Sequence, residues 1–537
     1  MTDTRPEQTL AQVLRKRVEH CGDKPWLLVD DRAFSYREID RRSNRLVKFL
    51  QRLEIGFGDT VLLMLPDTAD FVVTWCALAK LGAIEVPVNT YLRGGVLAHV
   101  INDSLAATLI IDRKYIDRIE TIAHELKSLK CIVLYSENAD GTEPGLPDSL
   151  RNLYQELRFE DHFADVEAVI DPGPTYTDLM AVMYTSGTTG PSKGVMITQA
   201  HAYEYALSVV ELLELRSNDV YYAPLPLFHI AGQWAVVYAC CIRSATAVLA
   251  GTFGLGKFWD EVNHYHATCT FLLGAMANFL YQQPETPQDT DNTLERALVV
   301  PLLPETEQFK QRFDCLVSAT WGSTEVNVPM RSGFVLPNSR TCGRVATDRY
   351  EVRIVDKDDN ELPPNVPGEA VVRAKEPWIL MAGYWNHPKW TVSAWRNLWL
   401  HSGDMLMRDE QGNFYFVDRI KDAIRRRGEN ISSMEVENEI NLNSSVLECA
   451  VIPVDSTHTE QEVMAVVVLR DDERLDPLEL TKFLEPRMAY FMVPRYIDIV
   501  EALPKTQTGK IQKYKLRENG ITPTTWDREA AGYKLKK

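Results

Sequence analysis

The sequence predicts an α/β protein with a large N-terminal domain of helix-covered β-sheets and a smaller α+β C-terminal domain. At 537 residues the chain is too long for one ordinary core, since domains usually hold about 100–200 residues. Strand–helix–strand units recur in the first part and predict a largely parallel sheet covered by helices. After about residue 370 a shorter α/β pattern follows. We therefore predict domains at 1–420 and 421–537, and the second is long enough for a core of its own.

The first helix with a clear start follows Ser35-Tyr36-Arg37-Glu38, which has the pattern of a capping box ahead of apolar residues at helical spacing. The elements expected after it are strands at 61–65, 84–88, 108–111 and 131–134 and a helix at 71–81. Polar stretches with prolines, at 137–147 and 282–293, predict surface loops.

In the C-terminal part, a strongly basic stretch at 420–428 follows a β-rich segment. The elements expected after it are a helix from Met434, strands at 449–454 and 463–469, and a helix that begins at Asp476-Pro477. Aspartate suits the N-cap and proline the first helical position.

Composition excludes several classes of protein. Apolar residues make up 45% and charged residues 25%, which is typical of globular chains. The net charge of −17 argues against nucleic-acid or anionic-membrane partners, because the mean field repels polyanions. The longest apolar stretch, Trp234 to Ile242, is too short to span a bilayer, and the first ten residues, MTDTRPEQTL, lack the basic flank and apolar core of a signal peptide. Nine scattered cysteines without a C-x-x-C spacing suggest neither disulfides nor zinc, so we expect a protein without an integral membrane segment in a reducing cytoplasm.

The segment most informative about chemistry runs from Tyr184 to Gly194, YTSGTTGPSKG. Glycines let backbone N–H groups converge, hydroxyls add donors and Lys193 adds charge, which together favour a cradle for phosphate oxygens. A flexible surface turn is the alternative. A Walker A loop is excluded, because Lys193 stands between Ser192 and Gly194 and not before a hydroxyl residue.

With further motifs, this segment resembles the adenylate-forming superfamily, which includes acyl-CoA synthetases, adenylation domains and firefly luciferase. The matching segments occur in the family's order and span residues 78 to 511: LAKLGA with VPVN, PLPLFH, WGSTE at 321–325, SGD at 402–404, VDR at 417–419 and PKTQTGK at 504–510. The resemblance implies an acyl-CoA synthetase-like fold with a mobile C-terminal domain. PLPLFHI and the basic stretch are similar to the crotonobetaine/carnitine-CoA ligase-like branch.

The resemblance implies an ATP site whose residues come from several motifs. The phosphate loop would consist of Thr185, Ser186, Gly187, Thr188, Thr189, Gly190 and Lys193. Trp321 would stack on adenine beside Gly322, Ser323 and Thr324, and Glu325 with Thr185 would bind Mg²⁺. Asp404, Phe416 and Arg419 would hold the ribose. Taken alone, each could be a core aromatic, a solvated acid or a surface ion pair.

The remaining implied residues serve the acyl group, catalysis and CoA. His229, with Gln233 and Trp234, would line the acyl pocket, although a lone histidine is often structural. Lys510 would bridge the carboxylate and the α-phosphate as charge develops. Lys421 would be the hinge, and Arg425, Arg427 and Gly428 would bind CoA, unless these arginines are only a solvated basic face.

The implied activity is an ATP-dependent carboxylate–CoA ligation through an acyl-adenylate, giving acyl-CoA, AMP and pyrophosphate. CoA is the expected acceptor because no carrier domain follows residue 537. A stand-alone enzyme that loads a carrier protein, and a non-catalytic nucleotide-binding relative, are the alternatives. No aspartate follows His229 closely, which argues against an α-amino acid and leaves fatty, aryl and zwitterionic acids open. The sequence also departs from the family at 297–302, ALVVPL, where a glycine turn beside adenine is missing.

Overall fold

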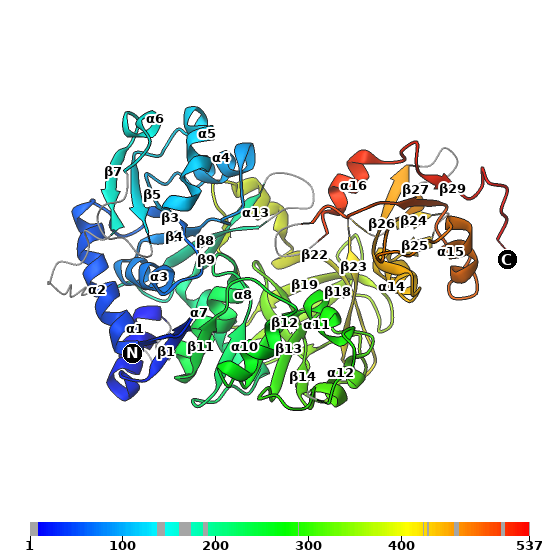
Figure 1. Cartoon of the computed structure of the whole chain (residues 1–537), viewed down its shortest axis with the longest axis horizontal. Helices are drawn as coiled ribbons and strands as arrows, with labels where there is room; N and C mark the ends of the chain where they lie inside the picture. Colours follow the sequence, from blue (N-terminus) through cyan, green and yellow to red (C-terminus); the bar gives the residue numbers. More distant parts are fainter. Residues whose placement is uncertain are drawn as a thin grey trace. The chain divides into compact units, whose positions relative to one another are not determined.

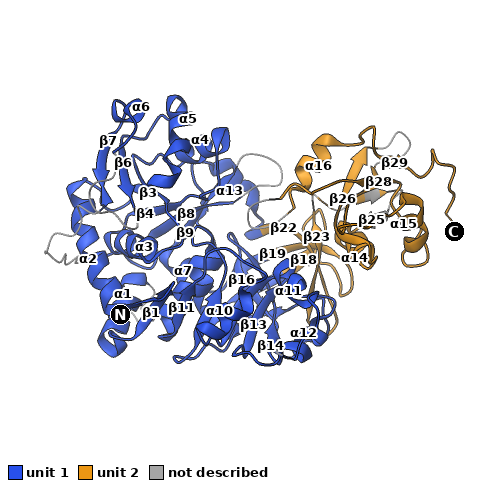
Figure 2. Ribbon diagram, viewed as in Figure 1, with its two compact units in different colours: residues 1–187, 191–352, 372–400 blue, residues 188–190, 353–371, 401–537 orange. Residues whose placement is uncertain are grey.

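The structure, a computed structural model, describes residues 9–136, 145–159, 173–185, 192–287, 289–420, 422, 424–426, 429–455, 461–505 and 511–535. The chain divides into two compact units, one of residues 1–187, 191–352 and 372–400 and one of residues 188–190, 353–371 and 401–537 (Figure 2). The predicted boundary at 421 falls within the second unit, because strands at 350–355, 368–374 and 399–408 each pass from one unit into the other.

The first sheet of the first unit contains the predicted βαβ unit (Figure 1). Its strands, in the order β20-β9-β8-β4-β3-β5-β6-β7, are β20 (Gly383–Tyr384), β9 (Lys193–Thr198), β8 (Leu179–Thr185), β4 (Ile84–Pro87), β3 (Thr60–Met64), β5 (Thr108–Asp112), β6 (Cys131–Tyr135) and β7 (Gln155–Arg158). Six strands are parallel, and β9 and β20 are antiparallel additions. The predicted strands at 61–65, 84–88, 108–111 and 131–134 are thereby confirmed within a residue or two at each end.

The helices beside this sheet include α3 (Ala69–Leu81), α4 (Gly94–Asp103), α5 (Ile116–Ile122) and α6 (Asp148–Arg151), with 3-10 turns η1 (Arg113–Tyr115) and η2 (Ala123–Glu125). The predicted capping residue Ser35 does begin α2 (Tyr36–Arg52), because its hydroxyl accepts a hydrogen bond from the Glu38 N–H at 3.1 Å. α2 packs on α3 and on α1 (Leu10–Cys21). Of the predicted loop at 137–147, residues 137–144 lie outside the described part.

The second sheet has the order β14-β13-β12-β10-β11-β1-β2 and is parallel except for β2. Its strands are β14 (Leu316–Ser318), β13 (Arg296–Val300), β12 (Cys269–Leu273), β10 (Val220–Ala223), β11 (Thr246–Leu249), β1 (Pro25–Val29) and β2 (Arg32–Ser35). Its helices are α7 (Gln199–Leu212), α8 (Ile230–Gly232), the π-helix η4 (Gln233–Tyr238), α9 (Ala239–Arg243), α10 (Phe258–His264), α11 (Gly274–Tyr281) and α12 (Thr306–Phe313). The apolar segment without glycine at 297–302 lies mostly in the buried strand β13, which explains its bulky side chains.

The last part of the first unit contains β15 (Thr320–Ser323), β16 (Asn327–Arg331), β17 (Thr341–Val345), α13 (Pro388–Ala394) and β21 (Trp395–Arg396). Three strands are shared in sequence between the units, namely β18 (Tyr350–Val355), β19 (Gly368–Ala374) and β22 (Trp399–Arg408).

The second unit has a core of its own, as its length predicts. Its elements are β23 (Phe414–Arg419), β24 (Ile424–Arg426), β25 (Glu429–Ile431), α14 (Ser433–Asn441), β26 (Val446–Asp455), β27 (Gln461–Leu469), α15 (Pro477–Leu484), β28 (Tyr496–Ile499), α16 (Lys513–Asn519) and β29 (Trp526–Asp527). A sheet in the order β26-β27-β28-β29 is packed by side chains of α14 and α15. The predicted start of α15 is confirmed, since Asp476 accepts from the Leu478 N–H at 2.7 Å and Pro477 follows it. Among the described helices of both units, none combines the length and apolarity needed to cross a membrane.

Candidate active site

The predicted phosphate loop joins two paired strands. Thr185 ends β8 and lies opposite Lys193, which begins the antiparallel strand β9, and the Thr185 hydroxyl is 3.5 Å from the Lys193 carbonyl oxygen. The sheet therefore fixes both ends of the segment. Ser186, Gly187, Thr188, Thr189 and Gly190 lie outside the described residues, so their predicted roles stay predictions.

The ammonium group of Lys193 lies over two aromatic rings, 5.0 Å from the ring centre of Tyr384 and 5.1 Å from that of Trp390. Trp390 is itself stacked on His387, with ring centres 3.7 Å apart and planes at 21°. Aromatic faces carry negative charge density and attract a cation by about 0.5–2 kcal/mol. Within the described part of the chain, Lys193 is thus oriented by two aromatic rings, and no ion pair with a carboxylate is present.

Glu325 contacts the same tyrosine. Its Oε1 accepts from the Tyr384 O–H at 3.2 Å and its Oε2 accepts from the Ser323 O–H at 2.9 Å. Tyr384 therefore presents its ring face to Lys193 and its hydroxyl to Glu325. Two predicted site residues from motifs far apart in the sequence meet on one side chain that the sequence analysis did not select.

Strand pairing places Tyr384 beside Lys193. The short strand β20 pairs with β9, with Tyr384 opposite Val195 and Gly383 opposite Met196. Gly383 has φ +143°, and a Cβ there would lie 2.9 Å from Thr391 and 3.0 Å from Met196, so a larger residue would be strained. The glycine permits the close approach that brings the tyrosine to the site.

Glu325 lies in the tight connection between β15 and β16. A Cβ on Gly322 would lie 2.1 Å from the Asn327 carbonyl oxygen, so this close approach requires glycine. Asn327 is buried and donates to the carbonyl oxygens of His201 and Ile379, which anchors the turn. Trp321 in β15 is only 5% exposed and Thr324 is also buried. The predicted contact between Trp321 and adenine stays a prediction.

His229 is exposed and caps the short helix α8, because its Nδ1 accepts from the Ala231 N–H at 3.1 Å. In the neutral ring this hydrogen bond leaves the proton on Nε2. The chain just before His229 is also held by a residue distant in sequence, since the Leu227 N–H donates to Asp67 Oδ1 at 2.7 Å. Burial raises the pKa of Asp67 to about 6, although the Leu227 N–H opposes the rise.

Gln233 and Trp234, predicted to line the acyl pocket, are both fully buried in the π-helix η4. The Gln233 amide donates to both carboxyl oxygens of Glu85 in β4, at 3.0 and 2.8 Å. Trp234 packs edge-on against Tyr205, with ring centres 6.1 Å apart. The Gln233 amide and the Trp234 ring thus make contacts inside the fold, and an acyl-pocket role for both residues stays a prediction.

Glu85 is fully buried and its nearest polar contact is the Gln233 amide. Loss of hydration raises the pKa of Glu85 to about 8, and the hydrogen bonds from Gln233 only partly oppose this shift. The carboxyl group is therefore mostly protonated at neutral pH. The backbone N–H of Gln233 donates to the His229 carbonyl oxygen at 3.0 Å. By holding the Gln233 side chain, Glu85 therefore also helps to fix the backbone that carries His229.

In the second unit, two predicted ribose residues meet. Asp404 in β22 pairs with Arg419 in β23, and Arg419 Nε lies 2.7 Å from Asp404 Oδ1. Asp404 is 3% exposed, so a charged partner is needed to offset its desolvation. Phe416 is half-buried in β23, the strand that also carries Arg419. The neighbouring Asp418 instead accepts from the N–H and O–H of Ser433 and fixes the start of α14.

Several predicted residues cannot be placed. Lys421, Arg427, Gly428 and Lys510 lie outside the described residues, and only the backbone of Arg425 is described, in β24. The ends of the lysine segment are nevertheless defined by a bridge between Lys505 and Ile511.

The comparisons with known proteins agree with the sequence resemblance. The sequence model of the family described as AMP-binding enzyme matches residues 14–385, and that of the AMP-binding enzyme C-terminal domain matches residues 435–510. These matches lie on either side of residue 421, so the exact boundary stays a prediction.

Curated relatives include the crotonobetaine/carnitine–CoA ligases of Salmonella typhi and Salmonella typhimurium, each 30% identical over 527 residues, 95% of this chain and 99% of the relative. Similar solved structures include the anthranilate CoA ligase AuaEII with anthranoyl-AMP (TM-score 0.82, 23% identity, 96% of this chain and 98% of that chain). ATP-bound MatB from Rhodopseudomonas palustris is similar to the same degree (TM-score 0.82, 24% identity, 95% and 98%). At these identities the two structures establish the fold.

The buried carboxyl group predicts a pH-dependent stability. A folded-state pKa of about 8, above the ordinary 4.5, means that folding takes up a proton, so wild-type stability falls as pH rises from about 4.5 to 8. Glu85→Gln removes the titrating group and, with it, this fall of stability. We expect the free energy of unfolding of the variant, relative to wild type, to rise by up to about 1.4 kcal/mol per pH unit between pH 5.5 and 7.5.

Urea unfolding at a series of pH values measures this difference. Glu285→Gln, at an exposed carboxylate, is the matched control and should show no such slope. A difference between Glu85→Gln and wild type that does not change with pH would contradict a raised pKa at this site.

Proposed function

Since the chain belongs to the AMP-binding enzyme family and is an ATP-dependent carboxylate–CoA ligase that works through an acyl-adenylate, we propose that Lys193, Tyr384 and Glu325 form its triphosphate site. The observation that carries this proposal is the shared tyrosine, which holds a cation on its ring and a carboxylate on its hydroxyl. In the first half-reaction a substrate carboxylate oxygen bonds to the α-phosphorus of ATP and pyrophosphate leaves. The CoA sulfur then bonds to the acyl carbon, its thiol proton is lost, and AMP leaves.

Glu325 and Thr185 fit a Mg²⁺ ion that takes its other ligands from ATP and water. No cluster of three or more histidine, cysteine or acidic residues suited to a metal occurs in the described part of the chain. Mg²⁺ is commonly held by one or two carboxylates together with substrate phosphates. A carboxylate also has about four lone-pair sites, so the hydrogen bonds from Ser323 and Tyr384 leave capacity on Glu325. When bound, Mg²⁺ neutralises charge on the departing pyrophosphate.

Lys193 is suited to receive a phosphate group because a cation held by two rings exchanges partners at low cost. An ion pair with Glu325 would have to be broken, whereas the contact with Tyr384 and Trp390 can persist on one side of the ammonium. The backbone N–H groups and hydroxyls of Ser186, Gly187, Thr188, Thr189 and Gly190 would complete the cradle.

For the nucleoside, Trp321 with Gly322, Ser323 and Thr324 would contact adenine, and Asp404 would accept from the ribose hydroxyls. Arg419 supports this role of Asp404, because their 2.7 Å ion pair orients the buried carboxylate. Phe416 would pack on the sugar.

His229 would face the substrate carboxylate, and the hydrogen bond from the Ala231 N–H to Nδ1 holds its ring in place. We propose that the acid is of the betaine type, a carboxylate with a quaternary ammonium group, because the curated relatives at 30% identity are named crotonobetaine/carnitine–CoA ligase. We place the reaction in the cytoplasm, where ATP and CoA are both available.

For thioester formation, Lys421 would act as the hinge of the C-terminal domain. Rotation about it would replace Lys510 by the segment at 425–428, where Arg425 and Arg427 would bind CoA phosphates and Gly428 would leave space for the pantetheine arm.

A carboxylate panel tests the substrate class. Crotonobetaine, carnitine, butyrate, octanoate, benzoate and an α-amino acid are compared by pyrophosphate release and acyl-CoA formation. We expect a kcat/KM for crotonobetaine or carnitine at least tenfold above that for butyrate, because a cation recognised on an aromatic face contributes about 1–2 kcal/mol. Higher kcat/KM for octanoate or benzoate would contradict the betaine proposal while leaving the ligase activity intact. Acyl-adenylate formation without acyl-CoA would indicate a carrier protein as the acceptor.

Substitution of Tyr384 separates its two contacts. Tyr384→Phe keeps the ring beneath Lys193 and removes the hydroxyl from Glu325, so we expect kcat to fall about tenfold with little change in the KM for ATP. Tyr384→Leu removes both contacts and should also raise the KM for ATP. Tyr91→Phe, at an exposed tyrosine, should behave as wild type. Wild-type kcat in Tyr384→Phe would exclude a role of the hydroxyl through Glu325.

Lys510→Ala tests whether the two half-reactions use different residues. Removing one cation from the developing charge should slow adenylation on the order of 10²–10³-fold. Synthetic acyl-adenylate with CoA should still give thioester at close to the normal rate. Lys421→Pro should leave adenylation intact and slow thioester formation, since proline fixes φ near −65° and restricts rotation about the hinge. An equal loss of rate in both half-reactions of Lys510→Ala would overturn the proposal that the C-terminal domain supplies different residues to each.

A further inference from the structure

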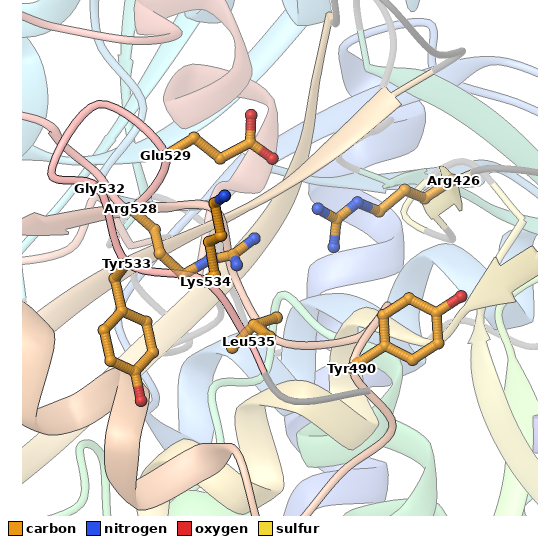
Figure 3. A pocket seen from close by; sticks show the side chains of 8 residues that line it. All are labelled: Arg426, Tyr490, Arg528, Glu529, Gly532, Tyr533, Lys534 and Leu535. Atoms are coloured by element: carbon orange, nitrogen blue, oxygen red, sulfur yellow. The ribbon is translucent and has the colours of Figure 1, made fainter.

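A concave site in the second unit takes no part in the proposed ligase chemistry. It is a cavity of about 450 Å³ whose lining includes Arg426, Arg528, Glu529 and Lys534 with Tyr490 and Leu535 (Figure 3). A volume of this size falls in the range of small-molecule sites. All of its lining residues belong to the second unit.

Arg528 is the unusual group in this cavity. It is 5% exposed, and its Nε finds no hydrogen-bond partner among the described residues. Loss of hydration lowers the pKa of its guanidinium group, and the nearby Glu529 and Glu462 only partly oppose this effect. A buried charged donor without a partner is costly unless an anion compensates it.

The acidic groups around the cavity are already paired with other cations. Glu462 lies 2.6 Å from Arg426, and both side chains are 2% exposed. Glu529 lies 3.1 Å from Arg495. Figure 3 shows the charged ends of Arg426, Arg528 and Lys534 directed toward the same space. Asp527, at 3.0 Å, shares Arg495 with Glu529. Around the cavity the four cations Arg426, Arg495, Arg528 and Lys534 therefore exceed the three carboxylates Glu462, Asp527 and Glu529 by one charge.

We propose that this cavity binds a small organic phosphate, with the phosphate group between Arg528 and Lys534. A phosphate monoester carries about −1.5 to −2 charges at pH 7, which suits converging cations better than the single charge of a carboxylate. The planar fork of an arginine can bind two phosphate oxygens at once. The Tyr490 ring and Leu535 supply an apolar wall for the organic part of the ligand.

Isothermal titration of the full chain with phenyl phosphate tests this proposal, because that probe joins a dianion to a flat ring. We expect saturable binding that is at least tenfold weaker for inorganic phosphate, which lacks the ring, and for benzoate, which lacks the second charge. Lys534→Gln, at an exposed position where folding should be preserved, is expected to weaken binding of phenyl phosphate about tenfold. Arg528→Gln should weaken it at least as much.

The matched controls are Lys515→Gln and Arg487→Gln, two exposed cations of the same unit outside the cavity lining, and both should bind as wild type. A crystal soaked with phenyl phosphate should show density between Arg528 and Lys534. Absence of saturable binding, wild-type affinity in Lys534→Gln, or equal affinity for inorganic phosphate or benzoate would each overturn the proposal. None of these measurements requires turnover, so their failure is separate from failure of the proposed ligase site.

Discussion

The pairing of β20 with β9 is the constraint on which the first unit's site depends. It puts Tyr384 next to Lys193, and the same tyrosine then reaches Glu325 through its hydroxyl. A direct ion pair between the lysine and the glutamate would neutralise both charges and would have to be broken for each ATP. Tyr384 instead holds Lys193 on its ring face and Glu325 on its hydroxyl, which keeps the two charges close. The lysine can then still bind a phosphate and the glutamate a metal. Gly383 makes the arrangement possible, because a side chain at φ +143° would collide with Met196 and Thr391.

The segment that carries His229 is held in another way. Two carboxyl groups, Asp67 and Glu85, accept hydrogen bonds from Leu227 and Gln233, and burial raises the pKa of both. A neutral or partly neutral carboxyl group costs less to bury than an ionised one and still anchors a donor. The fold thereby holds the segment that presents the exposed His229 by two carboxyl groups whose pKa values burial has raised.

The second unit buries two arginines beside one cavity, Arg426 and Arg528. Arg426 forms an ion pair with the buried Glu462 and donates to the Phe491 carbonyl oxygen, which fixes β24 to the rest of the unit. Arg528 is almost as buried, and its Nε has no hydrogen-bond partner within the described residues. Buried charges are usually paired because desolvation is expensive, and an exception beside a cavity is a reason to look for a ligand.

The sequence by itself determined the alternation of strands and helices, the capped starts of α2 and α15, the independent core of the C-terminal part and the family. Each of these follows from local periodicity, capping chemistry or ordered short motifs. It also selected Lys193, Glu325, Asp404 and Arg419, because these lie within such motifs. Only the tertiary structure decided that Tyr384 joins the first two, that Gln233 turns to Glu85 and that Trp234 lies in a π-helix. These contacts link residues up to about 190 positions apart, and strand pairing and burial create them without leaving any local pattern in the sequence.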